Sequence, residues 1–566
     1  MPMSNAPGEA RALSSNSSAA IAASASGALP GCAAHARSPR FVLLTASAAC
    51  ALVVLDTNVV AVSLPAIARS FHASFASVEW VVSAYMVAFA SSLLAAGGLA
   101  DRVGRKRTLL IGLAVFALAS LGCGLAPSIA ALNLARAVKG FGAALFLTSA
   151  LAVIAHTFQA GPERVKAWAF WGTCMGLATT AAPLVGGAIT QWIGWRGIFL
   201  LNLPVCAVLA VCVSIGIGDS RNPHAGPIDV AGSVLFGGGL ALGIWALIGA
   251  PAAGWTSAPT LLRFAGCALL VAGFVAVERV KARLGSHPMI DLALFRRPRF
   301  VAAVLAMFGY ASCAQVMMTF LPLYLQNAFG FTAIAAGLGM LPFAIAMVVG
   351  PYVGSICSAR LPGHAVLTLG LALIGAGNLA TALAAGEARY AVVALGLVVT
   401  GIGAGVLNGD TQKAIMACVP AHRMGMASGI STTTRFTAIV TSVGVLGAVL
   451  AAQTHAGLTA AAAAGRLPAA LLDARFLSSV LAGDTARAVS SMAASARPAL
   501  AAAARASFAA GFSAALDVAG GFALAVALLV WTLSRLDERV ETAWAGESTP
   551  ASPTNPGDAN ATAGRR

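Results

Sequence analysis

The sequence predicts an all-α integral membrane protein with fourteen transmembrane helices. Hydrophobic residues make up 59% of the 566 residues and charged residues only 10%, against about 25% charged residues in ordinary soluble domains. A chain of this composition cannot cover its surface with polar groups, so lipid must be its solvent. The net charge of +16 comes from basic residues in short loops between apolar stretches, which indicates membrane orientation rather than nucleic-acid binding.

Windows of about nineteen residues define the fourteen apolar spans. They cover residues 41–65, 80–100, 108–126, 129–153, 168–191, 197–217, 228–250, 260–279, 300–325, 333–357, 364–384, 389–412, 427–452 and 508–534. Because fourteen is an even number, both termini lie on the same side of the membrane.

Basic residues predict which side that is. Lys and Arg are concentrated in the loops that follow even-numbered spans, whereas the short loops of the other parity hold only Arg69, Arg196 and Arg389, with Arg263 at an edge. The positive-inside rule therefore assigns both termini to the cytoplasm of a multi-pass protein in the cell inner (plasma) membrane.

Three segments stand apart from the spans. Residues 1–40 are rich in Ser and Ala and predict a disordered cytoplasmic tail, and residues 535–566 predict a polar cytoplasmic tail. Residues 453–507 form a long Ala-rich external loop in which Leu472, Phe476 and Val480 recur at helical spacing. We expect short helices there, on the mouth of the protein.

A repeated spacing indicates two homologous halves. Gly97 follows Leu64-Pro65 by 32 residues, and Gly354 follows Leu321-Pro322 by the same interval. This predicts a six-helix half at 41–217, a six-helix half at 300–534, and two inserted helices at 228–279.

Asp56 is the sharpest functional candidate, because it lies inside the first apolar span. A carboxylate at that depth is costly unless it is paired, protonated or facing water, so it is a functional candidate by default. We expect Asp56 to exchange a proton. The alternative is a purely structural partner for a cation on a neighbouring helix.

Depth places two basic residues level with this acid. Asp56 lies nine residues before Pro65, or roughly 14 Å at 1.5 Å per residue. In the fourth span Arg136 lies roughly 11 Å from the same surface and Lys139 roughly 15 Å. Either residue is a candidate partner of Asp56, and a structural salt bridge remains the alternative.

The link between the second and third spans has five ionisable residues among seven positions, Asp101–Arg107. Gly97 and Gly104 predict close approach and a tight turn, and Asp101 is placed to cap a helix or pair with arginines of a neighbouring loop. This predicts a gating loop. The alternative is a loop whose charges serve only to orient the protein in the membrane. Its candidate residues are Gly97, Asp101, Arg102, Gly104, Arg105 and Lys106.

Another candidate contact lies at the inner face. Asp410 and Lys413 lie at the inner end of the twelfth span, and Arg435 lies about two turns inside the thirteenth. An Asp410–Arg435 bridge would close this face, and an Asp410–Lys413 pair is the alternative.

Several of these segments resemble the major facilitator superfamily. Residues 97–109 resemble its G-x-L-A-D-R-x-G-R-K-x-x-L loop between the second and third helices, and residues 55–65 resemble the first-helix signature L-D-x-T-V-V-N-V-A-L-P of fourteen-span drug:proton antiporters. The resemblance implies the major facilitator fold, with two six-helix halves and two inserted central helices. It also implies a proton-coupling role for Arg136, although Lys139 replaces the glutamine usual in that pattern.

Residues 179–187 resemble the G-P-x-x-G-G element that marks exporters in this superfamily. Pro183, Gly186 and Gly187 match it, whereas Ala178 and Ala182 replace glycines. The alternative is ordinary packing of small residues between helices.

Together these patterns predict a proton-coupled antiporter that exports small, amphipathic or cationic, drug-like molecules, and not an enzyme. Its expected partners are the substrate, protons and the lipid bilayer, without nucleic acid, and we expect a monomer. The sequence has no G-x-x-x-x-G-K-[ST] phosphate loop and no metal-ligand spacing among its ten cysteines, so we expect neither ATP drive nor a metal or other cofactor. The alternatives are a specific metabolite exporter of the same fold and a non-transporting membrane receptor or scaffold.

Overall fold

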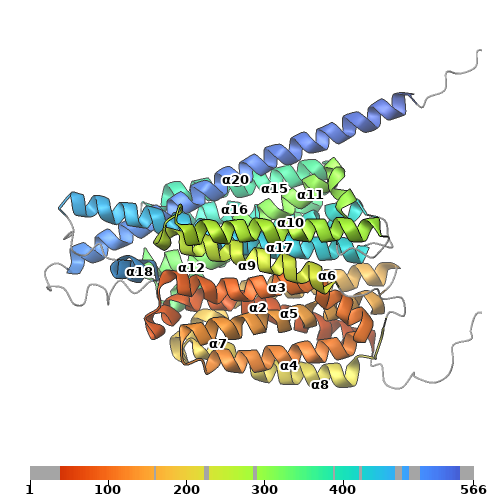
Figure 1. Ribbon diagram of the computed structural model, residues 1–566, viewed down its shortest axis with the longest axis horizontal. Helices are drawn as coiled ribbons and strands as arrows, with labels where there is room; N and C mark the ends of the chain where they lie inside the picture. The colour runs from red at the N-terminus through yellow and green to blue at the C-terminus, as the bar shows by residue number, and fades with distance from the viewer. Residues whose placement is uncertain are drawn as a thin grey trace, which may run out of the picture.

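The computed structural model describes residues 38–158, 161–221, 229–284, 290–315, 317–386, 389–419, 424–465, 474–482 and 497–547. Within these ranges every regular element is a helix, and the helices form one elongated bundle (Figure 1). Most of residues 1–40, which the sequence predicts to be disordered, lie outside the described residues, but Pro39 and Arg40 already belong to the first helix.

The first half of the bundle contains seven helices that make six crossings. They are α2 (Pro39–Phe71), α3 (Phe75–Val103), α4 (Arg105–Gly124), α5 (Ile129–Thr157), α6 (Gly161–Trp192), and α7 (Arg196–Leu200) continued by α8 (Asn202–Gly216). Two inserted helices follow, α9 (Val230–Ala253) and α10 (Ala258–Arg283).

The second half begins after the short helix η1 (Leu292–Arg296). It contains α11 (Pro298–Tyr310), the π-helix η2 (Ala311–Gln315), α12 (Met317–Asn327), α13 (Ala333–Gly339), α14 (Leu341–Ser358), α15 (Gly363–Ala385), α16 (Tyr390–Ala417), α17 (Met424–Ala463), α18 (Ala474–Ala482) and α20 (Arg497–Glu547).

Side-chain caps begin several of these helices. The side chains of Ser74, Ser128, Asp229 and Thr332 accept hydrogen bonds from backbone N–H groups at the starts of α3, α5, α9 and α13. Each cap pairs an N–H that would otherwise lack an intrahelical acceptor. Gly104, with a φ of +116°, makes the single-residue turn between α3 and α4.

Among the described residues, fourteen helical spans are long and apolar enough to cross a membrane, which confirms the predicted number. Several extend beyond the predicted windows, because a helix continues past the end of its apolar stretch. The predicted loop 453–507 is shorter than expected, since α17 continues to Ala463 and α20 begins at Arg497. In the same way α20 runs to Glu547, through the first part of the predicted C-terminal tail.

We call the end of the bundle that carries Arg102–Arg107 the basic end, and the opposite end the far end. α18 lies at the far end, at the left of Figure 1, where Ser478 accepts a hydrogen bond from the backbone N–H of Phe75. Phe476 and Val480 of α18 pack with Leu458 of α17 and Leu500 of α20. A short helix on the far end is thus present as the spacing predicts, while Leu472 lies outside the described residues.

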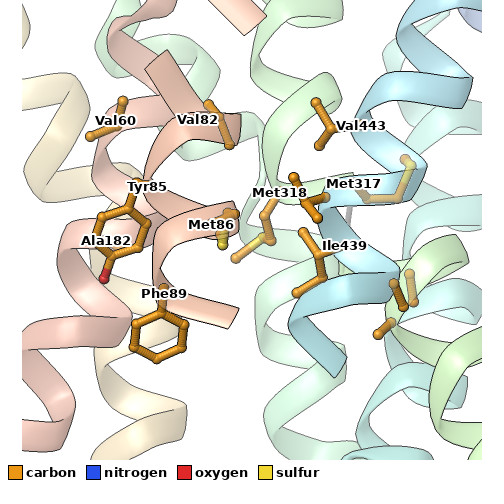
Figure 2. Packing of buried hydrophobic residues seen from close by; sticks show 14 of the residues in the cluster. Val60, Val82, Tyr85, Met86, Phe89, Ala182, Met317, Met318, Ile439 and Val443 are labelled. Atoms are coloured by element: carbon orange, nitrogen blue, oxygen red, sulfur yellow. The ribbon is translucent and has the colours of Figure 1, made fainter. Parts of the chain in front are cut away.

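The two halves meet along α3 and α17, α2 and α12, and α6 and α13. Met86 of α3 and Ile439 of α17 are among the buried apolar residues of this seam (Figure 2). Near the far end, Gln326 Nε2 donates to the carbonyl oxygen of Val62 over 2.9 Å, which joins α12 to α2. The inserted helix α9 contacts both α3 and α17, so it covers one side of the seam between the halves.

Candidate functional site

Asp56 lies on α2 with only 2% of its surface exposed. Its Oδ2 accepts a hydrogen bond from Arg136 Nη1 at 3.1 Å, and its Oδ1 accepts one from Lys139 Nζ at 2.5 Å. Arg136 and Lys139 are both completely buried. Because they lie three residues apart on α5, they share a helix face. Both candidate bases therefore contact the acid, at the level that depth arithmetic predicts.

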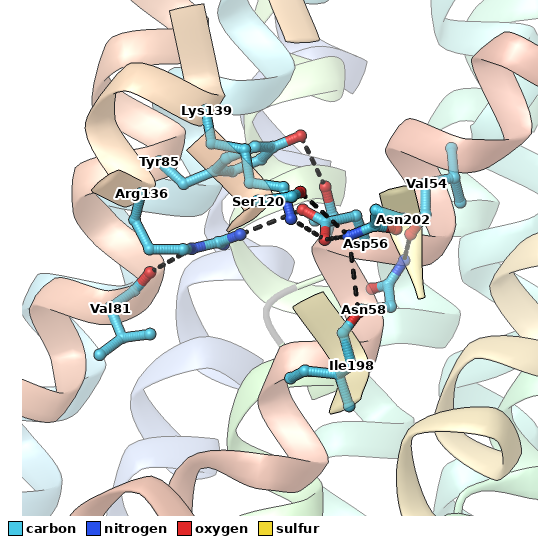
Figure 3. A network of polar contacts seen from close by, with 11 residues as sticks. Val54, Asp56, Asn58, Val81, Tyr85, Ser120, Arg136, Lys139, Ile198 and Asn202 are labelled. Carbon is cyan, nitrogen blue, oxygen red and sulfur yellow. Dashed lines mark hydrogen bonds and ion pairs between the residues drawn. The ribbon is translucent and has the colours of Figure 1, made fainter. Parts of the chain in front are cut away.

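A fourth side chain completes this group, which we call the Asp56 cluster: Asp56, Arg136, Lys139 and Asn202. Asn202, at the start of α8, donates to Asp56 Oδ1 at 2.9 Å (Figure 3). Arg136 Nε donates to the carbonyl oxygen of Val81 on α3 at 2.8 Å. The cluster thus joins four helices of the first half.

Aromatic rings enclose the two cations. The guanidinium carbon of Arg136 lies 4.2 Å from the centre of the Tyr85 ring. Lys139 Nζ lies 4.6 Å from the ring centre of Phe116 and 5.0 Å from that of Phe199. Ring faces attract cations, and these three side chains are themselves fully buried. The cations are therefore held in a dry, apolar shell.

The charges of the cluster do not balance. One carboxylate faces two cations, so full ionisation leaves one unit of positive charge in the interior. Arg136 Nη2 is buried, and no residue in the described part of the chain forms a hydrogen bond with it. An arginine stays protonated in proteins, whereas a buried lysine gives up its proton more readily. Loss of the Lys139 proton would leave a neutral Asp56–Arg136 pair.

A glycine allows α5 to approach α3 at this level. A Cβ at Gly140 would overlap the carbonyl oxygen of Tyr85. Gly140 follows Lys139 directly, and the close contact brings Arg136 within reach of the Val81 carbonyl. The local sequence Arg-Ala-Val-Lys-Gly thus combines the two bases with the residue that lets them reach across to α2 and α3.

The predicted gating residues lie at the basic end, away from the cluster. Gly97–Val103 belong to α3, so the turn is confined to Gly104. Asp101 pairs with Arg105 at 3.3 Å within the same segment, and Lys106 Nζ donates to the carbonyl oxygen of Ser214 on α8 at 2.7 Å. A Cβ at Gly97 would meet nothing within 4 Å, so no close approach requires glycine there. Arg102 is exposed in the last turn of α3.

The three candidate residues of α6 are Pro183, Gly186 and Gly187, and they face two different neighbours. A Cβ at Gly186 would lie 2.8 Å from the carbonyl oxygen of Val59 on α2, in the same half. A Cβ at Gly187 would lie 2.6 Å from the carbonyl oxygen of Ala333 on α13, in the other half. Pro183 lies inside α6, and its carbonyl oxygen would be 2.5 Å from a Cβ at Gly337 of α13. The small residues therefore permit backbone contact between the halves.

The hypothesis of an Asp410–Arg435 bridge is wrong for this structure. Asp410 pairs with Lys413 at 2.8 Å, because that lysine lies one turn further along the same helix. Arg435 donates to the carbonyl oxygen of Asn408 at 3.0 Å, with its guanidinium 5.6 Å from the ring centre of Tyr310.

Sequence reasoning missed the part that Asn202 plays. The signal was an amide side chain inside an otherwise apolar span, in Leu201-Asn202-Leu203-Pro204. The sequence also gives no sign that the Tyr85 ring packs on Arg136, because large residues of this kind are typical of both pockets and cores.

The chain is similar to known proteins along most of its length. The profile of the Major Facilitator Superfamily matches residues 46–443. The multidrug resistance protein Stp of Mycobacterium tuberculosis (strain CDC 1551 / Oshkosh) is 35% identical over 414 residues, which cover 72% of this chain and 75% of Stp. The tetracenomycin C resistance and export protein of Streptomyces glaucescens is 32% identical, over 73% of this chain and 76% of its own.

Solved structures show the same fold. A bacterial homologue of the human lysosomal transporter Spinster, in an inward-facing and occupied conformation, superposes with a TM-score of 0.59 at 17% identity. The match covers 88% of this chain and 97% of that one. The peptide transporter POT, in complex with sulfate, gives a TM-score of 0.59 at 16% identity, over 88% of this chain and 95% of that one.

Proposed function

Because the chain belongs to the major facilitator superfamily, we propose that it is a proton-coupled exporter of small, amphipathic or cationic, drug-like molecules across the inner (plasma) membrane. The observation that carries this proposal is the buried Asp56 cluster, in which one carboxylate faces two cations. The multidrug and antibiotic resistance proteins among its relatives support the substrate class.

The coupling step that we infer is the gain and loss of one proton at Lys139. When the site opens to water at the more acidic outer side, Lys139 binds a proton, because water stabilises the charged ammonium group. When the site closes and becomes dry, one excess positive charge is unfavourable, so Lys139 releases that proton and the neutral Asp56–Arg136 pair remains beside the uncharged amine. The cluster thus carries one excess positive charge when it is hydrated and none when it is dry, which couples proton binding to hydration of the cluster.

The positions of the contacts support a state that is closed at the far end, which is inward-facing if both termini lie in the cytoplasm, as the basic residues predict. Contacts that join the halves, such as Gln326 to Val62 and Ile334 to Gln191, lie at the far end. On the predicted orientation, the far end is extracellular and the basic end is cytoplasmic. We infer that one chain is the working unit, since the cluster is built entirely from one half.

A second candidate function is export of a single class of metabolite. Two relatives are named for one antibiotic each, tetracenomycin C and methylenomycin A, and the second is 33% identical over 70% of this chain. The two candidates differ in substrate range, so one panel of compounds separates them.

The test uses purified protein in proteoliposomes, with an imposed pH gradient and a panel of cationic and neutral compounds. We expect the wild type to move several of them against their gradients. Lys139→Gln should lose gradient-driven transport but retain substrate counterflow, because the variant keeps a hydrogen-bond donor near Asp56 but cannot exchange the proton.

Lys413→Gln is the matched control, since Lys413 also pairs with an aspartate but is 77% exposed. It should transport like the wild type. Undiminished gradient-driven transport by Lys139→Gln would contradict the coupling role of Lys139, and a wild type that is indifferent to the pH gradient would contradict proton coupling as a whole.

A further inference from the structure

A second buried acid lies outside the Asp56 cluster. Glu79 lies in the second turn of α3, near the far end, and only 6% of its surface is exposed. Its Oε1 is buried and has no hydrogen-bond partner among the described residues. None of the ion pairs that the described residues form includes Glu79.

This carboxyl group lies on the seam between the two halves. A Cβ at Gly447 of α17 would overlap Oε1 of Glu79, so the side chain fills the space that this glycine leaves open. One turn earlier on α17, a Cβ at Gly444 would lie 3.0 Å from Cβ of Leu247 on α9. The inserted helix therefore covers the seam beside Glu79 on that side.

Within the part of the chain that the structure describes, the neighbouring elements supply no cation that pairs with Glu79. Arg136 and Lys139 of α5 bind Asp56, and Arg435 of α17 binds the carbonyl oxygen of Asn408. Helix α9 has no titratable residue within Val230–Ala253. The remaining charged or titratable residues on the elements that pack against this part of α3 are Arg69 of α2, His455 of α17 and Arg475 of α18.

An ionised carboxylate without a partner is far more costly in an apolar interior than a neutral carboxylic acid. Glu79 is therefore compatible with the closed seam only as the neutral acid. Separation of α3 from α17 would expose it to water, where the carboxylate is stable. Protonation and closure of the far end thus favour each other.

We propose that Glu79 is a second proton-binding site, which binds a proton when α3 and α17 close on each other and releases it when they separate. The O–H bond forms at one carboxylate oxygen with a proton from the solution at the far end, and it breaks to return that proton to the same solution. The site gates the far end and does not itself carry protons across the membrane. Only the statement that this solution is extracellular rests on the proposed function.

Hydrogen–deuterium exchange of the full chain in lipid nanodiscs tests this proposal without a transport assay. Peptides from residues 75–86 and 440–450 report on the seam, and peptides from α15 and α16 serve as an internal reference. The measured exchange rates are corrected for the pH dependence of chemical exchange. We then expect the protection of the wild-type seam to fall by at least about tenfold from acidic to alkaline pH, because closure at alkaline pH would bury an ionised carboxylate.

Glu79→Gln should keep the seam protected at both pH values, since the amide is neutral and has the same shape. Lys413→Gln should retain the pH response of the seam, because this exposed side chain belongs to neither proton site. An unchanged pH response in Glu79→Gln would overturn the proposal, whereas loss of gradient-driven transport in the wild type would overturn only the proposed function.

Substitutions of glycine on α17 give a second, independent measurement. Gly447→Ala should open the seam at all pH values, because its Cβ overlaps Glu79, and Glu79→Ala in the same chain should restore protection. Gly444→Ala is the matched control, since its Cβ would lie 3.0 Å from Leu247 Cβ, a contact that needs a shift of only a few tenths of an ångström. Equal protection in Gly447→Ala and Gly444→Ala would show that Glu79 does not fill the seam, and would also overturn the proposal.

Discussion

Lys139 of α5 donates a hydrogen bond to Oδ1 of Asp56 on α2 over 2.5 Å, and the side chains are 0% and 2% exposed. The same carboxylate also accepts a hydrogen bond from Arg136. A single acid thus holds two cations inside the first half of the bundle. The stability and the proton chemistry of the site depend on how those three charges are balanced.

The first prediction concerns stability. Asp56→Asn leaves two buried cations without a counter-charge, and removal of one partner from a buried ion pair costs about 3–5 kcal/mol. Lys139→Gln alone should cost much less, because the Asp56–Arg136 pair remains. The double variant should be more stable than Asp56→Asn, since only one cation is left. Unfolding in detergent, analysed as a double-mutant cycle, measures this coupling; strict additivity would argue against direct contact.

The second prediction concerns Asn202, which donates to the same Oδ1 atom. Asn202→Asp adds a second carboxylate, so two acids then face two cations and the cluster is neutral when fully ionised. The variant should fold with near wild-type stability but hold the Lys139 proton more tightly. We expect slower transport driven by a pH gradient and normal substrate counterflow. Gradient-driven transport at the wild-type rate would mean that excess charge plays no part in coupling.

The third prediction concerns Gly104, the turn between α3 and α4. Its φ of +116° is unfavourable for residues with a Cβ, and a Cβ there would lie 2.8 Å from Asp219 Oδ1. Such backbone strain costs about 1–3 kcal/mol. Gly104→Ala should be destabilised by that amount and Gly104→Val by more. Gly97→Ala is the control, since its Cβ would meet nothing.

Turnover and substrate affinity, measured in the same preparation, separate a gating role from a structural one for this loop. If the loop takes part in conformational switching, Gly104→Val and Asp101→Asn should slow turnover with little change in affinity. Normal turnover in both variants would leave the segment as an orientation signal only.

The sequence predicted the fold well because each crossing leaves a local signal. A helix in lipid must be apolar over about twenty residues, so the spans can be counted without knowledge of any contact. The depth of Arg136 and Lys139 in the membrane relative to Asp56 could also be predicted, because the rise of a helix per residue converts residue number into depth.

Lateral contacts were harder to predict, because they depend on how each helix is rotated about its axis. Residue spacing alone does not decide that both Arg136 and Lys139 face Asp56, or that Asn202 joins them from α8. The incorrect Asp410–Arg435 bridge has the same origin, since depth alone did not exclude the closer Lys413. Glu79 was overlooked because it lies one residue before the predicted span 80–100, where a charged residue is expected to face water.

The last prediction concerns Gly187 of α6, where the two halves come into backbone contact. A Cβ at this position would lie 2.6 Å from the carbonyl oxygen of Ala333, a backbone atom that has little room to move. Gly187→Ala should therefore weaken closure of the far end and reduce turnover. If the strain is about 1.4 kcal/mol, hydrogen–deuterium exchange in residues 333–339 should rise by about tenfold. Gly176→Ala, on the same helix, is the control, since its Cβ would make an ordinary 3.6 Å contact with Val348. If the two variants show the same hydrogen–deuterium exchange and the same turnover, α6 packs as an ordinary small-residue helix, and its glycines have no part in the opening of the far end.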